Sequence, residues 1–221
     1  ELALNTDPQS SFGGIISFNG EVSEVLAKKI VSSFKEGVIA PSFTKDALKI
    51  LSTKENLRVL ETGSLDNYQR NPTLRSLDKG WLLQESDEAM IELADCKVVT
   101  KRKPSNDELE SLYFAWKIVK HVKSNAIVFA RSKNTVGIGA GQMSRIDSVK
   151  IAEFKSIPDA KGCVMASDAF FPFRDGIDEA VKAGITAVIQ PGGSMRDQEV
   201  IDAANEQNIA MIFTGMRHFK H

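Results

Sequence analysis

The residues best suited to chemistry are densest in one stretch of the chain, which reads S-N-A-I-V-F-A-R-S-K-N-T-V-G-I-G-A-G-Q-M-S-R-I from Ser124 to Ile146. Asn125 precedes an apolar run, so its amide can offer a donor and an acceptor from a fixed position. The next expected strand, 136–140, runs into a glycine-rich turn, and Arg145 falls in the first turn of a helix beginning at Ser144. Backbone N–H groups, a positive helix end and a guanidinium would converge there, which predicts a site for an anionic or carbonyl-bearing small molecule.

A second cluster is the aromatic stretch S-D-A-F-F-P-F-R-D, residues 167–175, which follows another expected strand. Its phenylalanines could plug the core. They could also form a wall for a flat ligand whose polar edge pairs with a carboxylate, and we favour this second interpretation.

Two glycine-rich segments are less specific. The G-x-G-x-G of residues 137–141 suggests a dinucleotide site, but its third glycine is misplaced, so a tight strand-to-helix connection that also admits a ligand is favoured. Gln190 to Ser194 reads equally well as a plain turn or as a ligand loop at a strand end.

The elements that must position these groups alternate between strand and helix from residue 105 to residue 214. Ser105 and Glu108 form a capping box ahead of an amphipathic helix, and further helices are expected at 144–154, 176–183 and 197–206. Short apolar strands separate them. This order predicts an α/β layered fold with a substantially parallel sheet.

Composition narrows the possible functions. The 221 residues carry 28 Lys and Arg against 29 Asp and Glu, so no overall basic field favours nucleic acid. No apolar run is long enough to cross a bilayer and no signal peptide is recognisable, so we expect a cytoplasmic protein. Cys96 and Cys163 lack zinc-ligand spacing, and both are expected to be buried.

Six motifs, in order along the whole chain, resemble the bacterial bifunctional purine biosynthesis family that combines AICAR (aminoimidazole carboxamide ribonucleotide) transformylase with IMP cyclohydrolase. They are D-P-Q-S-S-F-G-G-I-I-S-F-N, V-K-S-N-A-I-V-F-A, I-G-A-G-Q-M-S-R-I, S-D-A-F-F-P-F-R-D-G-I-D, I-Q-P-G-G-S and T-G-M-R-H-F-K-H. The resemblance implies transfer of a formyl group from 10-formyltetrahydrofolate to AICAR, giving formyl-AICAR. It also implies two cytidine-deaminase-like α/β/α lobes without zinc. The first lobe would be represented in part by residues 1–100, and the second would be complete in residues 101–221.

The resemblance also implies roles for single residues. Asn125 would be the catalytic residue, orienting the amine and the formyl group and helping proton transfer. The other AICAR contacts would come from Arg145 at the carboxamide, Phe170 at the base and Arg217 at the phosphate. The folate side would be formed by Ile146, Pro172, Phe173 and Asp175.

Three further implications concern assembly and ions. The family forms homodimers whose sites borrow residues from the partner subunit, and Phe12, Gly13 and Glu36 match the borrowed set. Ser124 and Asp168 resemble contributors to a structural site for a monovalent cation, with potassium as the candidate.

The family's general acid/base is a Lys-His pair that would lie upstream of Glu1, and Lys120-His121 occupies a different place in the motif order. Because the chain starts with Glu1 rather than Met, we expect a fragment of a longer polypeptide. The resemblance implies that it is the later part of the transformylase region, and without the Lys-His pair we expect it to be inactive alone. A noncatalytic nucleotide- or folate-binding module is the main alternative, and a zinc-dependent hydrolase of the deaminase fold is a third.

Overall fold

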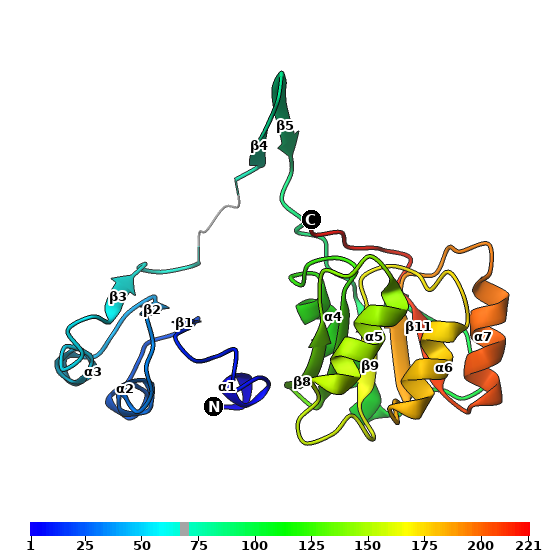
Figure 1. Cartoon of the computed structure of the whole chain (residues 1–221), viewed down its shortest axis with the longest axis horizontal. Helices are drawn as coiled ribbons and strands as arrows, with labels where there is room; N and C mark the ends of the chain where they lie inside the picture. The colour runs from blue at the N-terminus through cyan, green and yellow to red at the C-terminus, as the bar shows by residue number, and fades with distance from the viewer. Residues whose placement is uncertain (67–70) are drawn as a thin grey trace. The chain divides into compact units, whose positions relative to one another are not determined.

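The computed structural model describes residues 1–66 and 71–221, which divide into two compact units (Figure 1). The larger unit comprises residues 1–7 and 87–221, and the smaller one comprises residues 8–86. The division falls before the expected boundary at residue 100 because Ile91 is buried in the larger unit and Val98 pairs with its sheet. The assignment of the two units to family lobes stays a prediction.

A six-stranded sheet forms the centre of the larger unit, in the order β6-β11-β10-β9-β7-β8. Its strands are β6 (Lys97–Val98), β7 (Ile127–Arg131), β8 (Asn134–Gly139), β9 (Val164–Ser167), β10 (Ala187–Gln190) and β11 (Ala210–Phe213). Strands β9, β10 and β11 are parallel, whereas β7 is antiparallel to both of its neighbours and β6 is antiparallel to β11. The expectation of a substantially parallel sheet is therefore met only in the middle, since β7 and β8 are joined by a tight turn at Ser132 and Lys133 that reverses the chain.

Helices cover both faces of this sheet. On one face lies α4 (Asn106–Val119), and on the other lie α5 (Arg145–Phe154), α6 (Asp175–Lys182) and α7 (Asp197–Glu206). Strand alternation divides the core accordingly, because Ile127 and Phe129 pack with α5 to α7 while Val128 and Ala130 pack with α4. The capping box predicted at Ser105 and Glu108 is confirmed at the start of α4.

The N-terminal residues complete the larger unit. After the short helix α1 (Leu2–Asn5), the Thr6 hydroxyl lies 2.8 Å from the Thr135 hydroxyl, and Lys155 forms an ion pair with Asp7 at 2.7 Å. A 3-10 turn at Leu93–Asp95 precedes β6. These contacts attach residues 1–7 to β8 and to the end of α5.

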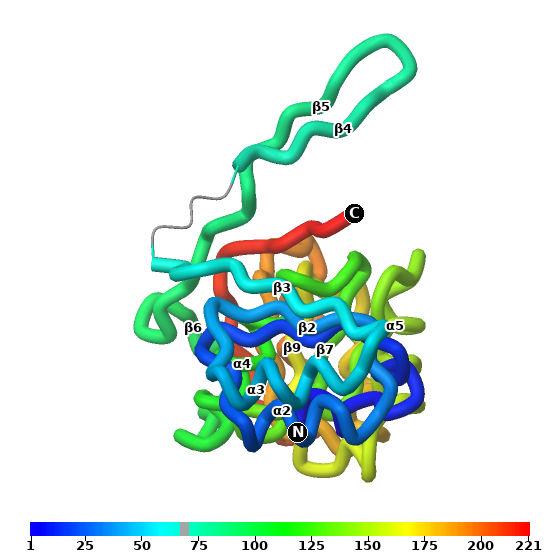
Figure 2. Tube along the Cα trace, turned by 90° about the vertical axis from the view of Figure 1, so that its left-hand side faces the viewer, coloured from blue at the N-terminus to red at the C-terminus, as the bar shows by residue number. Residues whose placement is uncertain are grey.

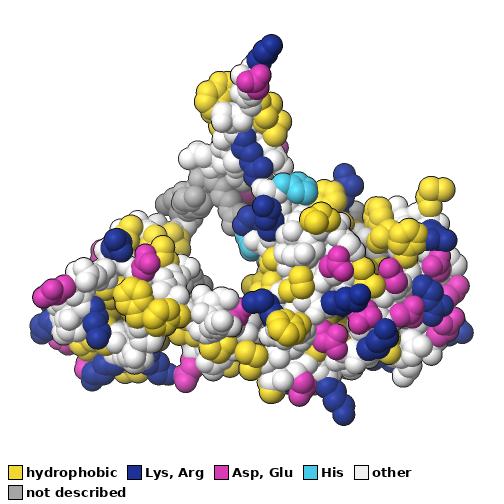
Figure 3. Space-filling view, viewed as in Figure 1, with side chains coloured by type: hydrophobic (Ala, Val, Ile, Leu, Met, Phe, Trp, Pro, Cys, Tyr) yellow, Lys and Arg dark blue, Asp and Glu magenta, His cyan; other side chains and the backbone are white. Residues whose placement is uncertain are grey.

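The smaller unit contains a parallel sheet of β1 (Ile15–Ser17), β2 (Gly37–Ala40) and β3 (Arg58–Glu61), which Figure 2 shows side by side. Helices α2 (Glu24–Val31) and α3 (Lys45–Leu51) pack against it through a small apolar core. An antiparallel hairpin follows, formed by β4 (Thr73–Leu77) and β5 (Gly80–Gln84). Figure 3 shows hydrophobic side chains gathered on this hairpin. The exposed ones are Leu74, Leu77, Trp81, Leu82 and Leu83.

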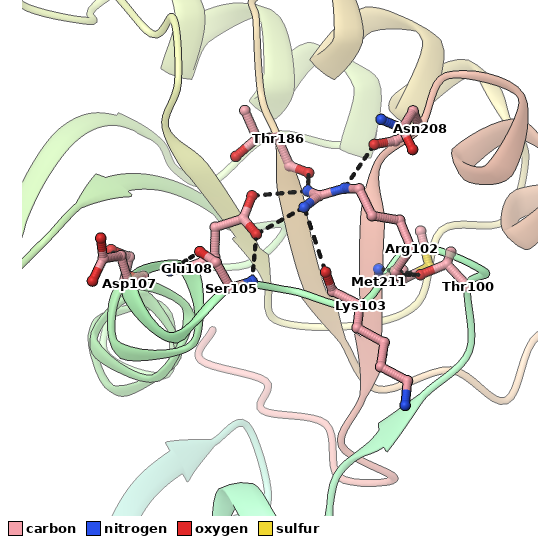
Figure 4. A network of polar contacts seen from close by, with 10 residues as sticks. Thr100, Arg102, Lys103, Ser105, Asp107, Glu108, Thr186, Asn208 and Met211 are labelled. Carbon is pink, nitrogen blue, oxygen red and sulfur yellow. Dashed lines mark hydrogen bonds and ion pairs between the residues drawn. The ribbon is translucent and has the colours of Figure 1, made fainter.

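Arg102 forms a network of polar contacts, called the Arg102 clasp below, at the end of the larger unit where the parallel strands begin (Figure 4). The Arg102 guanidinium donates to both carboxylate oxygens of Glu108, at 2.9 and 2.8 Å, and also to the backbone carbonyls of Thr186 and Asn208. Because Thr186 precedes β10 and Asn208 lies just before β11, the clasp joins α4 to both strands. It leaves the opposite edge of the sheet open for a site.

Candidate functional site

The predicted site residues of the larger unit gather at the edge where β8, β9, β10 and β11 end. Asn125 reaches the same edge because β7 runs antiparallel to β9, so that Ile127 at its start pairs with Ser167 at the end of β9. The residues that follow β8 and β9 supply the glycine-rich turn and the aromatic loop. This is the edge at which open α/β sheets place ligands.

Arg145 and Asn125 are joined directly. The Arg145 guanidinium donates from Nη2 to Asn125 Oδ1 at 3.0 Å, and from Nη1 to Ser167 Oγ at 2.8 Å and Asp168 Oδ1 at 2.5 Å. The predicted helix start is confirmed, since Ser144 is the N-cap of α5 and Arg145 is its first residue. The guanidinium is held mainly by the protein, because only 8% of the Arg145 side chain is exposed.

The amide of Asn125 is fixed on both sides. Its Nδ2 group donates to the carbonyls of Gln142 and Met143 at 3.0 and 2.9 Å, so both of its N–H bonds are used. Its Oδ1 accepts from Arg145, and an amide oxygen has a second lone pair. Asn125 is therefore suited to accept one more hydrogen bond from a ligand N–H or O–H group.

The aromatic loop combines both interpretations of its sequence. Phe171 is fully buried, and its backbone N–H donates to the Gln190 side chain at 3.2 Å, so this residue is the core plug. Phe170 is half-buried, and Phe173 is 48% exposed with the Arg196 guanidinium 4.9 Å from its ring centre. The ring of Phe171 therefore belongs to the core, whereas the rings of Phe170 and Phe173 remain accessible to a ligand.

These groups line a hollow of about 410 Å³, which lies entirely in the larger unit. The predicted residues on its walls are Asn125, Arg145, Ile146, Phe170, Pro172, Phe173, Asp175 and Arg217. They come from four separate stretches of the sequence. The hollow combines aromatic and aliphatic walls with a carboxylate, an amide and two guanidinium groups, which is typical of small-molecule sites.

The remaining predicted ligand residues lie together in the smaller unit. Gly13 donates its N–H to the Phe34 carbonyl at 3.2 Å, and Glu36 donates its N–H to the Gly14 carbonyl at 3.2 Å. Phe12 is 69% exposed and its ring packs against Phe34 with centres 5.6 Å apart. Two segments, joined by these hydrogen bonds, therefore bring Phe12, Gly13 and Glu36 together.

Ser124 and Asp168, predicted to contribute to a monovalent-cation site, lie together, and the cation itself stays a prediction. The Ser124 hydroxyl donates to Asp168 Oδ2 at 2.6 Å and accepts from the Lys220 N–H at 3.1 Å, while Asp168 Oδ1 accepts from Arg145. These oxygens are engaged with protein donors, whereas hard cations require several oxygen ligands. Within the described ranges, no cluster of His, Cys, Asp and Glu could hold a metal ion.

The structure also shows what the glycines of β8 do and whether the two cysteines are buried. Gly137 and Gly139 serve packing, because a Cβ atom would lie 2.0 Å from the Ala152 carbonyl oxygen and 1.9 Å from that of Ser148 respectively. Cys163 is buried as expected and burial raises the pKa of its thiol, but Cys96 is only partly buried.

No helix in the part of the chain described here is long and apolar enough to cross a membrane.

Comparison with known proteins decides the family. The family model described as the AICARFT/IMPCHase bienzyme matches residues 1–155, which is more than half of the chain. The chain belongs to the AICARFT/IMPCHase bienzyme family. A solved structure of protein ybgI, of unknown function, is similar to 94% of this chain and 74% of its own length at 14% identity, but its TM-score of 0.23 supports no conclusion.

The AICARFT/IMPCHase family connects this chain with purine biosynthesis by formyl transfer or cyclohydrolysis. The hollow is also lined by five residues to which sequence reasoning assigned no ligand role of their own, namely Met143, Ser144, Ala169, Phe171 and Phe219. Phe219 had a detectable signal, since it lies two positions after Arg217 in the C-terminal motif and an extended segment turns alternate side chains to one side. Met143 had none, because its position depends on the turn that follows β8.

Proposed function

We propose that this chain forms the substrate-positioning part of an AICAR transformylase, which transfers the formyl group of 10-formyltetrahydrofolate to AICAR. One observation carries the proposal: the AICAR and folate residues expected in the larger unit line a single hollow. They were identified from motifs that lie far apart in the sequence. The layered sheet of this unit would be the zinc-free, cytidine-deaminase-like lobe.

Asn125 would hold the reacting amine. The free lone pair of its Oδ1 accepts an N–H of the AICAR amine, and the bond from Arg145 keeps this oxygen directed at the hollow. Attack on the formyl carbon requires the amine to lose a proton and the departing folate nitrogen to gain one. Asn125 can orient the amine but cannot perform this exchange, because a neutral amide is neither acid nor base near neutral pH.

The other residues would divide the two ligands between them. Arg217 is exposed at the hollow, with its guanidinium 5.0 Å from the Phe219 ring centre, and would pair with the AICAR phosphate. Phe170 would pack against the base. Ile146, Pro172 and Phe173 would contact the folate, and Asp175 would accept N–H groups from the pterin edge.

Arg145 would act mostly through Asn125 and Asp168, with its edge reaching the carboxamide. Its guanidinium already has three protein acceptors, so only part of its donor capacity is left for a ligand. The part of Arg145 in binding the carboxamide would therefore be smaller than the resemblance implied.

The complete enzyme would be a cytoplasmic homodimer, in which Phe12, Gly13 and Glu36 of one subunit complete the partner's site. Mixing two inactive variants tests this arrangement. Asn125→Ala and Glu36→Ala subunits of the complete enzyme should each lose activity, whereas mixed dimers should contain one intact site. Failure of the mixture to recover activity would show that the site does not borrow these residues.

The formyl-transfer proposal is tested with the purified 221-residue chain and with the complete enzyme. Calorimetric titration of the chain with AICAR should show binding, and an assay for formyl-AICAR should show product only with the complete enzyme. Turnover by the chain alone would overturn the division between positioning and proton transfer. Binding without turnover in either protein would favour a noncatalytic module.

A further inference from the structure

The C-terminal segment 217–219 presents its side chains alternately to opposite sides. Arg217 and Phe219 are exposed and line the hollow, whereas His218 between them is only 2% exposed. Extended backbone produces this alternation. The orientation of the two ligand-facing side chains therefore depends on how the His218 side chain is held.

His218 is held by a carboxylate from a distant part of the chain. Its Nδ1 lies 2.5 Å from Oδ2 of Asp87, and its ring centre lies 5.1 Å from that of Trp116 on α4. The Lys120 ammonium group is 3.8 Å from the other Asp87 oxygen and donates to the Ala89 carbonyl at 3.0 Å. Asp87 thus links the His218 ring to the Lys120 ammonium group.

The backbone of the segment is held at two more points. The His218 N–H donates to the Asp168 carbonyl at 2.9 Å, and Ser124 exchanges hydrogen bonds with Lys220 through its own N–H and hydroxyl. These bonds fix the path of the main chain beside Asn125. The His218 side chain lies between Arg217 and Phe219 and attaches the segment at a further point, through Asp87 and Trp116.

The buried anchor of this segment is a polar imidazole, that of His218, rather than an apolar side chain. An apolar side chain would fill a buried position at lower cost, since an imidazole loses hydration when it is buried. Among the described residues, His218 Nε2 has no hydrogen-bond partner, so this cost is only partly offset. The directional bond from Nδ1 to Asp87 is what the imidazole provides and an apolar side chain cannot.

We propose that His218 is a positioning residue, which through Asp87 and Trp116 holds Arg217 and Phe219 in place at the hollow. The inference rests on the proposed function only for the identity of the ligand. It assigns His218 no part in proton transfer, because its ring is directed away from the hollow.

Three substitutions separate positioning from general stability. His218→Ala removes the whole anchor, His218→Phe keeps the packing against Trp116 without the bond to Asp87, and His218→Asn keeps a donor near the place of Nδ1. Val200→Ala, on the buried face of α7, serves as the destabilised control. Thermal unfolding of each variant shows whether it folds.

The first measurement needs no ligand. Amide hydrogen exchange over residues 216–220 should be faster in His218→Ala and His218→Phe than in the wild-type chain or Val200→Ala, and His218→Asn should restore much of the protection. Unchanged exchange in both anchor-free variants would overturn the inference, whatever the chain binds.

The second measurement is calorimetric titration with AICAR. His218→Phe should weaken binding about tenfold in the wild-type background and have little effect in an Arg217→Ala background, because the anchor acts through Arg217. An equal loss in both backgrounds would contradict positioning. A wild-type chain that binds no AICAR would count against the proposed function, while hydrogen exchange would still decide the role of His218.

Discussion

The guanidinium of Arg145 donates to the side-chain oxygen of Asn125 at 3.0 Å and, from its other terminal nitrogen, to the carboxylate of Asp168 at 2.5 Å. Asp168 is 1% exposed, so this carboxylate depends on Arg145 and Ser124 for compensation of its lost hydration. The same arginine that neutralises a buried charge thus orients the amide that faces the hollow. Stability and site geometry are coupled at this residue.

Removal of the Arg145 guanidinium should therefore be costly. We expect Arg145→Ala to lower the free energy of unfolding by about 3–5 kcal/mol, since it leaves Asp168 as a buried carboxylate without its cation. Arg145→Lys should recover part of this loss but not the bond to Asn125, because an ammonium group lacks the planar fork of donors. Urea unfolding of the 221-residue chain measures both effects.

The matched control is Arg174→Ala. Arg174 pairs with two carboxylates, those of Asp178 at 2.9 Å and Glu206 at 2.8 Å, but all three side chains are more than a third exposed. Such pairs contribute about 0–1 kcal/mol. Similar losses for Arg145→Ala and Arg174→Ala would contradict the importance assigned to the buried network.

Asn125 and Arg217 should affect different kinetic constants of the complete enzyme. Asn125→Ala removes the acceptor for the attacking amine, so it should lower kcat more than it weakens AICAR binding. Arg217→Ala should mainly raise the KM for AICAR, because the phosphate takes no part in bond formation. Steady-state kinetics at saturating folate measures both constants, and purely affinity-type losses in both variants would show that Asn125 is misassigned.

The Arg102 clasp should make stability dependent on pH under acidic conditions. Burial alone would raise the pKa of Glu108, but hydrogen bonds from Arg102 and from the Ser105 N–H outweigh it and lower the pKa to about 2. Since the pKa in the unfolded chain is about 4.3, the ionised group stabilises the fold above that pH and loses this effect as the pH falls toward 2. The free energy of unfolding from pH 6 to pH 2 should show this decline.

Glu108→Gln provides the comparison. It should be less stable than the wild-type chain at pH 6, and the difference should shrink as the pH falls, because the wild-type side chain then becomes neutral too. Glu110→Gln, on the exposed surface of the same helix, should follow the wild-type curve. A constant difference between Glu108→Gln and the wild-type chain across this range would contradict the role of the clasp.

Sequence reasoning succeeded where one local signal determined the structure. The capping box at Ser105, the helix start at Ser144 and the alternation of strands and helices were all readable, because each depends on neighbouring residues. The direction of β7 was missed because it is set by the Ser132 turn and by pairing with β9, which lies more than 30 residues away. The internal bonds of Arg145 were unreadable because Asp168 reaches it only after the sheet has formed.

The packing role of Gly139 in β8 was likewise not predictable from neighbouring residues, and substitution can test it. Gly139 was expected to combine a tight connection with a ligand turn, but a Cβ at this position would lie 1.9 Å from the Ser148 carbonyl oxygen on α5. Gly139→Ala should therefore displace α5 and lower the free energy of unfolding by about 1–3 kcal/mol. Because α5 carries Arg145, AICAR affinity should also fall.

Gly20→Ala, where a Cβ meets nothing within 4 Å, is the control and should change stability by less than about 0.5 kcal/mol. Equal effects of the two substitutions on urea unfolding would show that the close approach of α5 to β8 is not what requires glycine.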